Sequence, residues 1–542
     1  MGLHGNAGIF SKGIIKSMSG MFETKSDKAS RKLERTKKEE KAKRKTRIIT
    51  ITIISILVLV SASAILINSS FIRRTLPVVT IDGVAFSTTE FEYFFNTQYL
   101  EYMNMMSQFQ GLGDNLPNPR RPLSTQVYNN ETGETWADFF TELALSRMSN
   151  LTSLYNSANA ANFTLTEEHL EEIEQELAMI SLQAMLEGAP NTDSFLQQMF
   201  GNSINESTYR KILNFVSTAG AYSEFVRESF SYTPEQISGY YQENRDSLDV
   251  FNYRSFVLSH EQLDILDFES EEAYNAEVEA SIEAVRLRAA QIVSEGVENA
   301  DEFIEIAQRE TDNYSDWIGS VQFRMGESLD GAFENWLRND QRNYGDMTAI
   351  DSATGSTILY FVSRDDNTYK TVAMRQILIL RDNIDPNDFP EGEADPAYIS
   401  AIENAQLESH ERAELVYSLF IAAGETENAL LNLMAEHSDD TTEGGFYEDI
   451  ARFSYSSSHS YTMKVVPEIE EWLFDENRKF GDSQLISTRD FGYHLVYFMG
   501  FGDPFNELIA TDRMRTRDHN EWLDGLSHGQ PVKHAAFILV HI

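Results

Sequence analysis

The sequence predicts an α+β protein with a single transmembrane helix, a mainly helical domain and two tandem α+β modules. Three observations support this fold class. Residues 48–67 form an uncharged stretch rich in Ile, Val and Leu. Apolar residues then recur at helical spacing through residues 87–231. The patterns of residues 250–368 recur in residues 369–500, which indicates a duplicated module.

Composition excludes several classes of function. The 542 residues include no cysteine, which excludes disulfides, thiolate metal sites and a cysteine nucleophile. The net charge of −41 is uneven: residues 1–47 carry 14 Lys/Arg against 5 Asp/Glu, and the rest carry 30 against 80. A surface this negative disfavours nucleic acid as a partner. We interpret the acidity as a solubility feature; a calcium-loaded surface is the alternative, although no D-x-D-x-D-G loop supports it.

The N-terminal region predicts a membrane anchor. Residues 1–47 are polar and Lys-rich, as in a solvated tail. Twenty helical residues span about 30 Å, the thickness of a bilayer core, so residues 48–68 are predicted to cross the membrane. A cleaved signal peptide is the alternative, since residues 61–64 resemble a cleavage site. Basic residues before the stretch place the N-terminus in the cytoplasm and residues 69–542 outside, facing the periplasm or the cell surface.

The next region predicts a strand pair followed by helices. Two short strands flank the turn Asp82-Gly83, and Ser87 or Thr88 caps the helix that follows. This first helix carries aromatic and Met side chains, which favour either core packing or an adaptable groove for unfolded chains. The predicted helices cover Glu90–Met106, Trp136–Ala158, Glu167–Leu186, Ser207–Phe230 and a linker helix capped by Thr233.

The internal repeat is visible as fixed offsets. Nine residues separate Trp336 from Gly345 in the first copy, and nine separate Trp472 from Gly481 in the second. The entry strands also match, Tyr253–Leu258 against Met374–Leu378. Agreement at several offsets predicts two tandem modules, each with short strands and helices around a small sheet.

The second module carries a set of motifs in a fixed order: R-x-I-L-I, then S-D, G-G, P-x-I-x-x-W, F-G and F-G-Y-H-L-V. This order resembles the parvulin-type peptidyl-prolyl isomerases. The segment V-x-I-D-G-x-x-F-S-x-x-E-F near the N-terminus resembles the SurA-, PrsA- and PpiD-like foldases. The resemblance implies a membrane-anchored extracytoplasmic foldase that binds unfolded exported polypeptides and isomerises X-Pro bonds, with no cofactor and no metal.

With this resemblance, the chain divides into six predicted segments. They are a cytoplasmic basic tail (1–47), a transmembrane helix (48–68), a SurA-N-like helical chaperone domain (75–249), a degenerate parvulin-like module (250–368), a parvulin-like isomerase module (369–500), and a C-terminal helical segment with a poorly determined tail from Ser527 (501–542). The resemblance also implies that the C-terminal segment packs back on the helical domain.

Prolyl isomerisation requires twisting an amide over a barrier of about 18–20 kcal/mol. The resemblance implies that His494 and Asp440 act in catalysis, with Asp439 as the neighbour most easily confused with Asp440. Gln376 stands where the family has a first histidine, and it can hydrogen-bond but not titrate. The structural alternative for His494 is a histidine that only hydrogen-bonds within the sheet. His437 beside the two aspartates lacks the further ligand that a metal site needs.

The implied substrate-binding residues are apolar. Val465 and Ile469 fall where the family has bulkier Met and Phe, and Met463 and Phe491 complete the predicted pocket.

In the first module, Ser255 and Thr357 replace the two histidines and Asp312-Asn313 replaces the acidic pair, so no isomerase activity is expected there. The alternative functions are an isomerase-inactive chaperone or scaffold and a wall-associated adhesion or structural protein.

Overall fold

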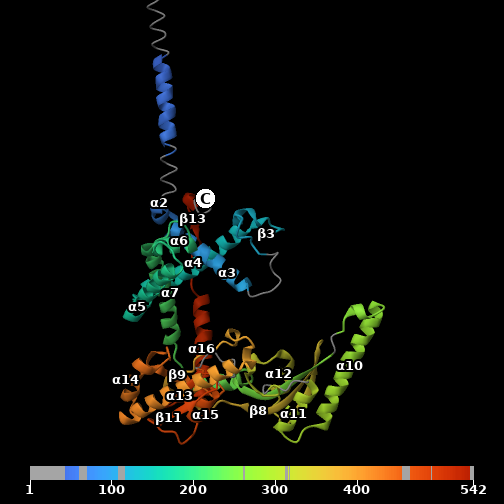
Figure 1. Ribbon diagram of the computed structural model, residues 1–542. Coiled ribbons are helices and arrows are strands. Elements are labelled where there is room, and N and C mark those ends of the chain that lie inside the picture. Colours follow the sequence, from blue (N-terminus) through green and yellow to red (C-terminus); the bar gives the residue numbers. More distant parts are fainter. Residues whose placement is uncertain are drawn as a thin grey trace, which may run out of the picture. The chain divides into compact units, whose positions relative to one another are not determined.

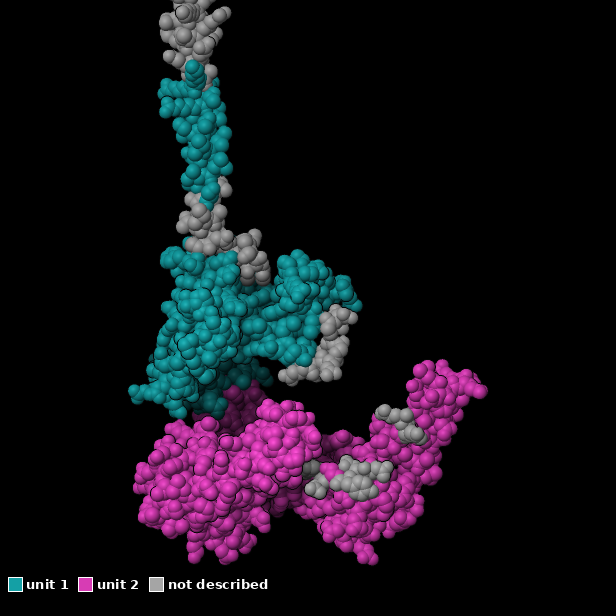
Figure 2. Space-filling model, viewed as in Figure 1, with its two compact units in different colours: residues 1–226, 523–542 teal, residues 227–522 magenta. Residues whose placement is uncertain are grey.

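The computed structural model of the protein describes residues 43–59, 61, 70–107, 116–260, 263–311, 315, 318–453, 464–489 and 491–537. Within these residues the chain is α+β, with helices and four small sheets. It divides into two compact units, residues 1–226 with 523–542 and residues 227–522 (Figure 2).

The prediction of a transmembrane helix is wrong, because the described residues contain no helix that is long and apolar enough to cross a membrane. Residues 43–59 are helical and include basic residues of the tail together with residues 48–59 of the apolar stretch. Residues 60 and 62–69 lie outside the described residues.

The first unit combines two small sheets with helices (Figure 1). Its elements are α2 (Ser70–Thr75), β1 (Pro77–Ile81), β2 (Val84–Ser87), α3 (Thr88–Ser107), β3 (Val127–Asn129), β4 (Glu134–Thr135), α4 (Trp136–Ala160), α5 (Glu167–Leu186), α6 (Thr192–Phe200), α7 (Glu206–Ser229, which runs into the second unit) and β13 (Val532–Lys533).

Local chemistry explains where these elements begin. Asp82 and Gly83 have φ of 43° and 83°, the left-handed pair of a two-residue hairpin turn between β1 and β2. At the start of α3, the N–H of Glu90 donates to Ser87 Oγ, and the N–H of Ser87 donates back to the Glu90 carboxylate. Thr166 caps α5 in the same reciprocal way with His169.

The core of the first unit absorbs much of the aromatic stripe of α3. Phe91 and Phe94 are buried, whereas Met105 further along the helix is exposed. Core packing therefore accounts for the first half of the stripe.

The C-terminal segment completes this sheet, whose strand order is β13-β1-β2. The carbonyl of Gly529 accepts a hydrogen bond from Ser149 Oγ at 2.8 Å, and the ring of Phe537 packs edge-on against Phe91. The expectation of an undetermined tail from Ser527 is therefore wrong for residues 527–537, because backbone pairing and an aromatic anchor hold them. Residues 538–542 lie outside the described residues.

The second unit contains two sheets built alike (Figure 1). The first module has β5 (Val250–Ser259), α10 (Glu271–Glu295), α11 (Ala300–Thr311), β6 (Val321–Met325), α12 (Gly331–Leu337), β7 (Met347–Asp351) and β8 (Gly355–Asp365). The second has β9 (Lys370–Leu380), α13 (Pro396–Ala422), α14 (Glu427–His437), β10 (Phe446–Ile450), α15 (Pro467–Leu473), β11 (Ser483–Ser487) and β12 (Gly492–Pro504).

The strand orders of the two sheets correspond one to one, β6-β5-β8-β7 and β10-β9-β12-β11. The registers agree as well, since Arg254 lies opposite Tyr360 and Arg375 lies opposite Tyr497. This is the arrangement that a duplicated module requires.

The helices that flank the modules are α8 (Pro234–Glu243), α9 (Arg245–Leu248) and α16 (Phe505–Asp524). Tyr241 and Leu248 are buried in one cluster with Phe505 and Ile509. This cluster belongs to the second compact unit, which begins at residue 227.

Candidate functional site

The candidate site lies on one face of the second module's sheet, at the paired strands β9 and β12. Gln376 lies opposite Val496, and His494 lies opposite Leu378 on β9 and Ile486 on β11. Val496 and Ile486 belong to the buried cluster that α15 covers, so this face is otherwise apolar. Gln376 and His494 are nearly inaccessible, with 5% and 4% of their surface exposed.

Three of the predicted residues form a continuous hydrogen-bonded chain. His494 Nδ1 lies 2.8 Å from Gln376 Oε1, and Gln376 Nε2 donates to Asp440 Oδ2 at 2.7 Å. At the far end, His494 Nε2 lies 3.2 Å from the hydroxyl of Thr488. Tyr447 donates its hydroxyl to Asp440 Oδ2 at 3.0 Å.

Electrostatics set the protonation of the two ends of this chain. Burial lowers the pKa of His494 to about 4, although the charges of Asp440 and Glu468 act in the opposite direction. Burial by itself raises the pKa of Asp440, but hydrogen bonds from the N–H of Thr442 and from Gln376, Thr442 and Tyr447 side chains hold the pKa of that carboxyl below its usual value. At neutral pH the imidazole is therefore neutral and the carboxyl is ionised.

These charge states fix the direction of every hydrogen bond in the chain. An ionised carboxylate can only accept, so Gln376 presents its NH₂ group to Asp440 and its carbonyl oxygen to His494. That oxygen can only accept, so the proton of the neutral imidazole sits on Nδ1. The unprotonated Nε2 can then accept from the Thr488 hydroxyl, which also lies within hydrogen-bond distance of the carbonyl of Gly492. The chain is thus polarised from Thr488 towards Asp440.

The structure separates the two adjacent aspartates. Asp440 joins the chain, whereas Asp439 Oδ2 accepts from the N–H of Leu380 at 2.8 Å and from Arg412 at 3.0 Å. Ser438 Oγ accepts from the N–H groups of both Leu378 and Asp440. Ser438 and Asp439 therefore dock this loop on β9, and only Asp440 faces the chain.

The predicted apolar residues take different positions. Val465 and Ile469 are buried in the core cluster under the sheet, with 4% and 1% of their surface exposed. Phe491 is 39% exposed, and its ring packs edge-on to the imidazole of His494 with centroids 6.2 Å apart. Met463 lies outside the described residues. Among the described residues of the site, Phe491 is the exposed apolar group, and Asp440 and Tyr447 are half-buried.

Two contributors, Thr488 and Tyr447, were missed from the sequence. Both come from strand ends outside the quoted motifs, Thr488 after β11 and Tyr447 in the short edge strand β10. Tyr447 pairs with Met374, close enough to Gln376 that alternation along β9 and β10 was a usable signal.

The first module has no equivalent chain in its described residues. By register, Ser255 and Gln322 occupy the positions of Gln376 and Tyr447, and they bond each other at 2.6 Å. Thr357 occupies the position of His494. Asp312 and Asn313 lie outside the described residues.

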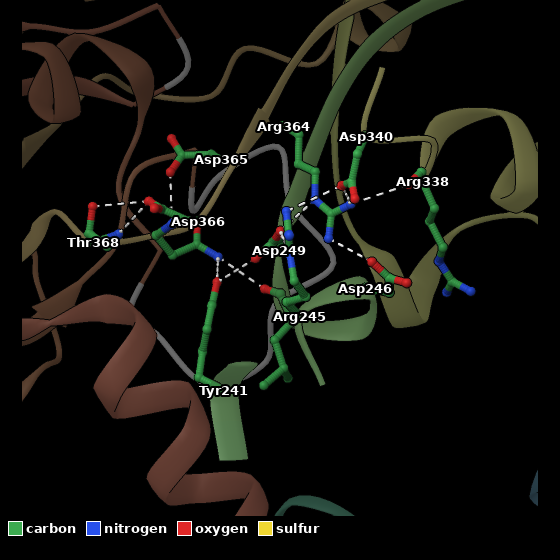
Figure 3. A network of polar contacts seen from close by, with 12 residues as sticks. Tyr241, Arg245, Asp246, Asp249, Arg338, Asp340, Arg364, Asp365, Asp366 and Thr368 are labelled. Carbon is green, nitrogen blue, oxygen red and sulfur yellow. Dashed lines mark hydrogen bonds and ion pairs between the residues drawn. The ribbon is translucent and has the colours of Figure 1, made fainter. Parts of the chain in front are cut away.

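A second polar cluster, at the start of the first module, is a structural clasp (Figure 3). The buried Asp249 accepts from Tyr241 at 2.8 Å and pairs with Arg364, which also donates to Asp246 at 2.7 Å. Asn367 donates to the carbonyl of Leu248 at 3.0 Å. These bonds join α8, α9, the residue before β5 and β8. Their charged groups are paired with one another, which leaves this cluster a stabilising role. Within the described residues no group of three His, Asp or Glu side chains could hold a metal ion.

Comparison with known proteins gives no assignment: no family model matches this chain, and no curated protein matches it.

Proposed function

We propose that this chain binds unfolded polypeptides and that its second module catalyses cis–trans isomerisation of X-Pro peptide bonds. The observation that carries the proposal is the polarised chain from Thr488 through His494 and Gln376 to Asp440, beside the exposed ring of Phe491. The resemblance of the surrounding motifs to parvulin-type isomerases supports it.

In this proposal Asp440 contacts the substrate, and Gln376 and His494 are positioning residues. Resonance in a planar amide gives the C–N bond double-bond character and places negative charge on oxygen. A carboxylate held beside that oxygen destabilises the planar form more than the twisted form, in which resonance is lost. The hydrogen bonds to Asp440 keep it ionised and fixed, and Phe491 offers an apolar surface to the proline ring.

The test is isomerisation of a short proline-containing peptide by the full chain. Asp440→Asn keeps the shape but removes the charge that destabilises the planar amide, and we expect the rate enhancement to fall about tenfold, which corresponds to a barrier higher by about 1.4 kcal/mol. His494→Ala is expected to reduce it similarly, while Thr357→Ala in the first module is the matched control and leaves it unchanged. No rate enhancement by the wild type, or an unchanged rate in Asp440→Asn, contradicts the catalytic proposal.

One observation favours a second candidate, an isomerase-inactive chaperone or scaffold of the same architecture. Both ring nitrogens of His494 already have partners within the protein, and Gln376 stands where the resemblance implies a histidine. This candidate predicts suppression of aggregation of a denatured protein by the full chain without catalysis of proline isomerisation. If the chain neither suppresses aggregation nor catalyses proline isomerisation, both candidate functions are contradicted.

A further inference from the structure

The first unit contains a cavity of about 560 Å³ beside the outer edge of β2. We propose that this cavity binds an extended, acidic polypeptide segment, which adds to β2 as a short strand, buries one apolar side chain and places a carboxylate at Lys211. The proposal rests on the polypeptide-binding part of the proposed function and specifies where and in what form a segment binds.

The lining of the cavity suits an apolar side chain. Phe86 and Phe94 come from β2 and α3, Tyr155 from α4, and Ile212 and Phe215 from α7. Pockets that bind organic ligands in proteins measure about 300–1,000 Å³ and are mostly apolar, so this cavity has the size and chemistry of a binding site.

The edge of β2 offers backbone groups to a ligand. Ile81 and Val84 flank the two-residue turn and so form the hydrogen-bonded pair of this hairpin. The next pair, Thr80 and Ala85, then directs its backbone groups away from the partner strand. Ala85 is exposed and lines the cavity, and among the described strands β2 is the edge of its sheet. One extended residue can therefore exchange two backbone hydrogen bonds with Ala85.

The charges at the cavity favour an acidic segment. Glu90 is buried, and its carboxylate accepts from the N–H and hydroxyl of Ser87 and from Lys211 Nζ at 2.6 Å. The Lys211 side chain is 69% exposed, and its ammonium has further N–H donors directed at solvent. Arg210 also lines the cavity, but it pairs with Glu174 and Glu206, so Lys211 is the group that can receive a carboxylate from the segment.

The experiment measures binding of a fluorescent peptide to the full chain by anisotropy. The probe alternates valine and threonine around one leucine and ends in a free carboxylate. Proline at position 85 lacks the outward N–H but is tolerated at a strand edge, so Ala85→Pro should weaken binding about tenfold. Ala85→Ser keeps the N–H and is the matched control, with affinity expected within about twofold of wild type. The same peptide ending in an amide should bind about threefold more weakly, and this difference should vanish in Lys211→Gln.

The outcomes separate this inference from the isomerase proposal. Ala85 lies in the first unit and His494 in the second, so hydrogen exchange on α4 and α7 reports whether Ala85→Pro keeps the first unit folded. Equal peptide binding by wild type and Ala85→Pro overturns the inference. The inference is also overturned if peptide binding falls as protein concentration rises, because a second copy of the chain then occupies the cavity. If the wild type binds the peptide without isomerase activity and Ala85→Pro loses that binding, the catalytic proposal is removed and this inference is supported.

Discussion

The two modules of the second unit keep the same frame around different sites. In each, an arginine stacks on the tryptophan of the short helix and donates to that tryptophan's carbonyl: Arg342 on Trp336 and Arg478 on Trp472. In each, the glycine nine residues after the tryptophan donates its N–H to the long strand, Gly345 to Phe361 and Gly481 to Phe498.

The modules differ where the polar chain lies. The second module has Gln376 and His494 linked to Asp440, and the first has Ser255 and Thr357 at the corresponding positions. Shorter side chains at the same register cannot bridge the two strands, so Ser255 bonds Gln322 on the neighbouring strand instead. The comparison teaches that the frame depends on residues away from the site, and the site can therefore change without loss of the fold.

The largest expected effect tests whether the two frames are equally stable. Leu337 and Leu473 follow the matched tryptophans and both are fully buried. Replacing either by alanine leaves a cavity in its own module, and we expect each to cost about 3 to 4 kcal/mol. Amide hydrogen exchange on β8 for Leu337→Ala and on β12 for Leu473→Ala measures each loss separately.

Equal losses in the two leucine variants would support a shared frame. A loss below about 1 kcal/mol in only one module would show that its core is packed differently and would break the comparison.

Much of this frame could be predicted because its signals are local. The Asp82-Gly83 turn, the start of α5 at Thr166 and the repeat around Trp336 and Trp472 depend on residues close in sequence. The convergence of Gln376, Asp440 and His494 was predictable only through the motif order. The choice of Asp440 over Asp439 required the structure, in which Asp439 docks the loop on β9.

Features set by distant segments were not predictable. The pairing of β13 with β1 joins residues some 450 positions apart, and nothing in the short segment around Val532 signals its partner. Thr488 and Tyr447 join the site through sheet geometry that no motif records. The transmembrane prediction rested on hydropathy, segment length and the basic flank, and the described residues contain no helix long and apolar enough to cross a membrane.

A pH difference between the modules is the second expected effect. His494 has a pKa of about 4 in the folded protein against 6.5 for an ordinary histidine, so the unfolded chain binds a proton first as pH falls. Stability of the second module is therefore fully present above about pH 6.5 and is lost between there and pH 4, by at most about 3 kcal/mol. Thr357 does not titrate, so the first module lacks this loss.

Hydrogen exchange on β12 and β8 across this range measures the pH effect in each module. The loss from Asp440, whose pKa is lowered, begins as pH falls through the ordinary pKa of an aspartate, about 3.9, and continues below it, so it follows the His494 loss on the pH axis. His494→Gln is the control and should flatten the profile of β12 between pH 6.5 and 4. An unchanged profile in that variant would show that another group titrates.

The smallest expected effect concerns the arginines that stack on the tryptophans. Arg478 donates through both Nε and Nη2 to the carbonyl of Trp472, whereas Arg342 donates to Trp336 through Nε alone. Lysine cannot reproduce the planar stack or the paired donors, so Arg478→Lys should cost about 1 kcal/mol and Arg342→Lys somewhat less. Thermal unfolding of the two variants, compared with hydrogen exchange on each sheet, tests this order. If Arg342→Lys proved the more costly, the stacked arginine would support the first module more than the second, and the frame would have diverged along with the site.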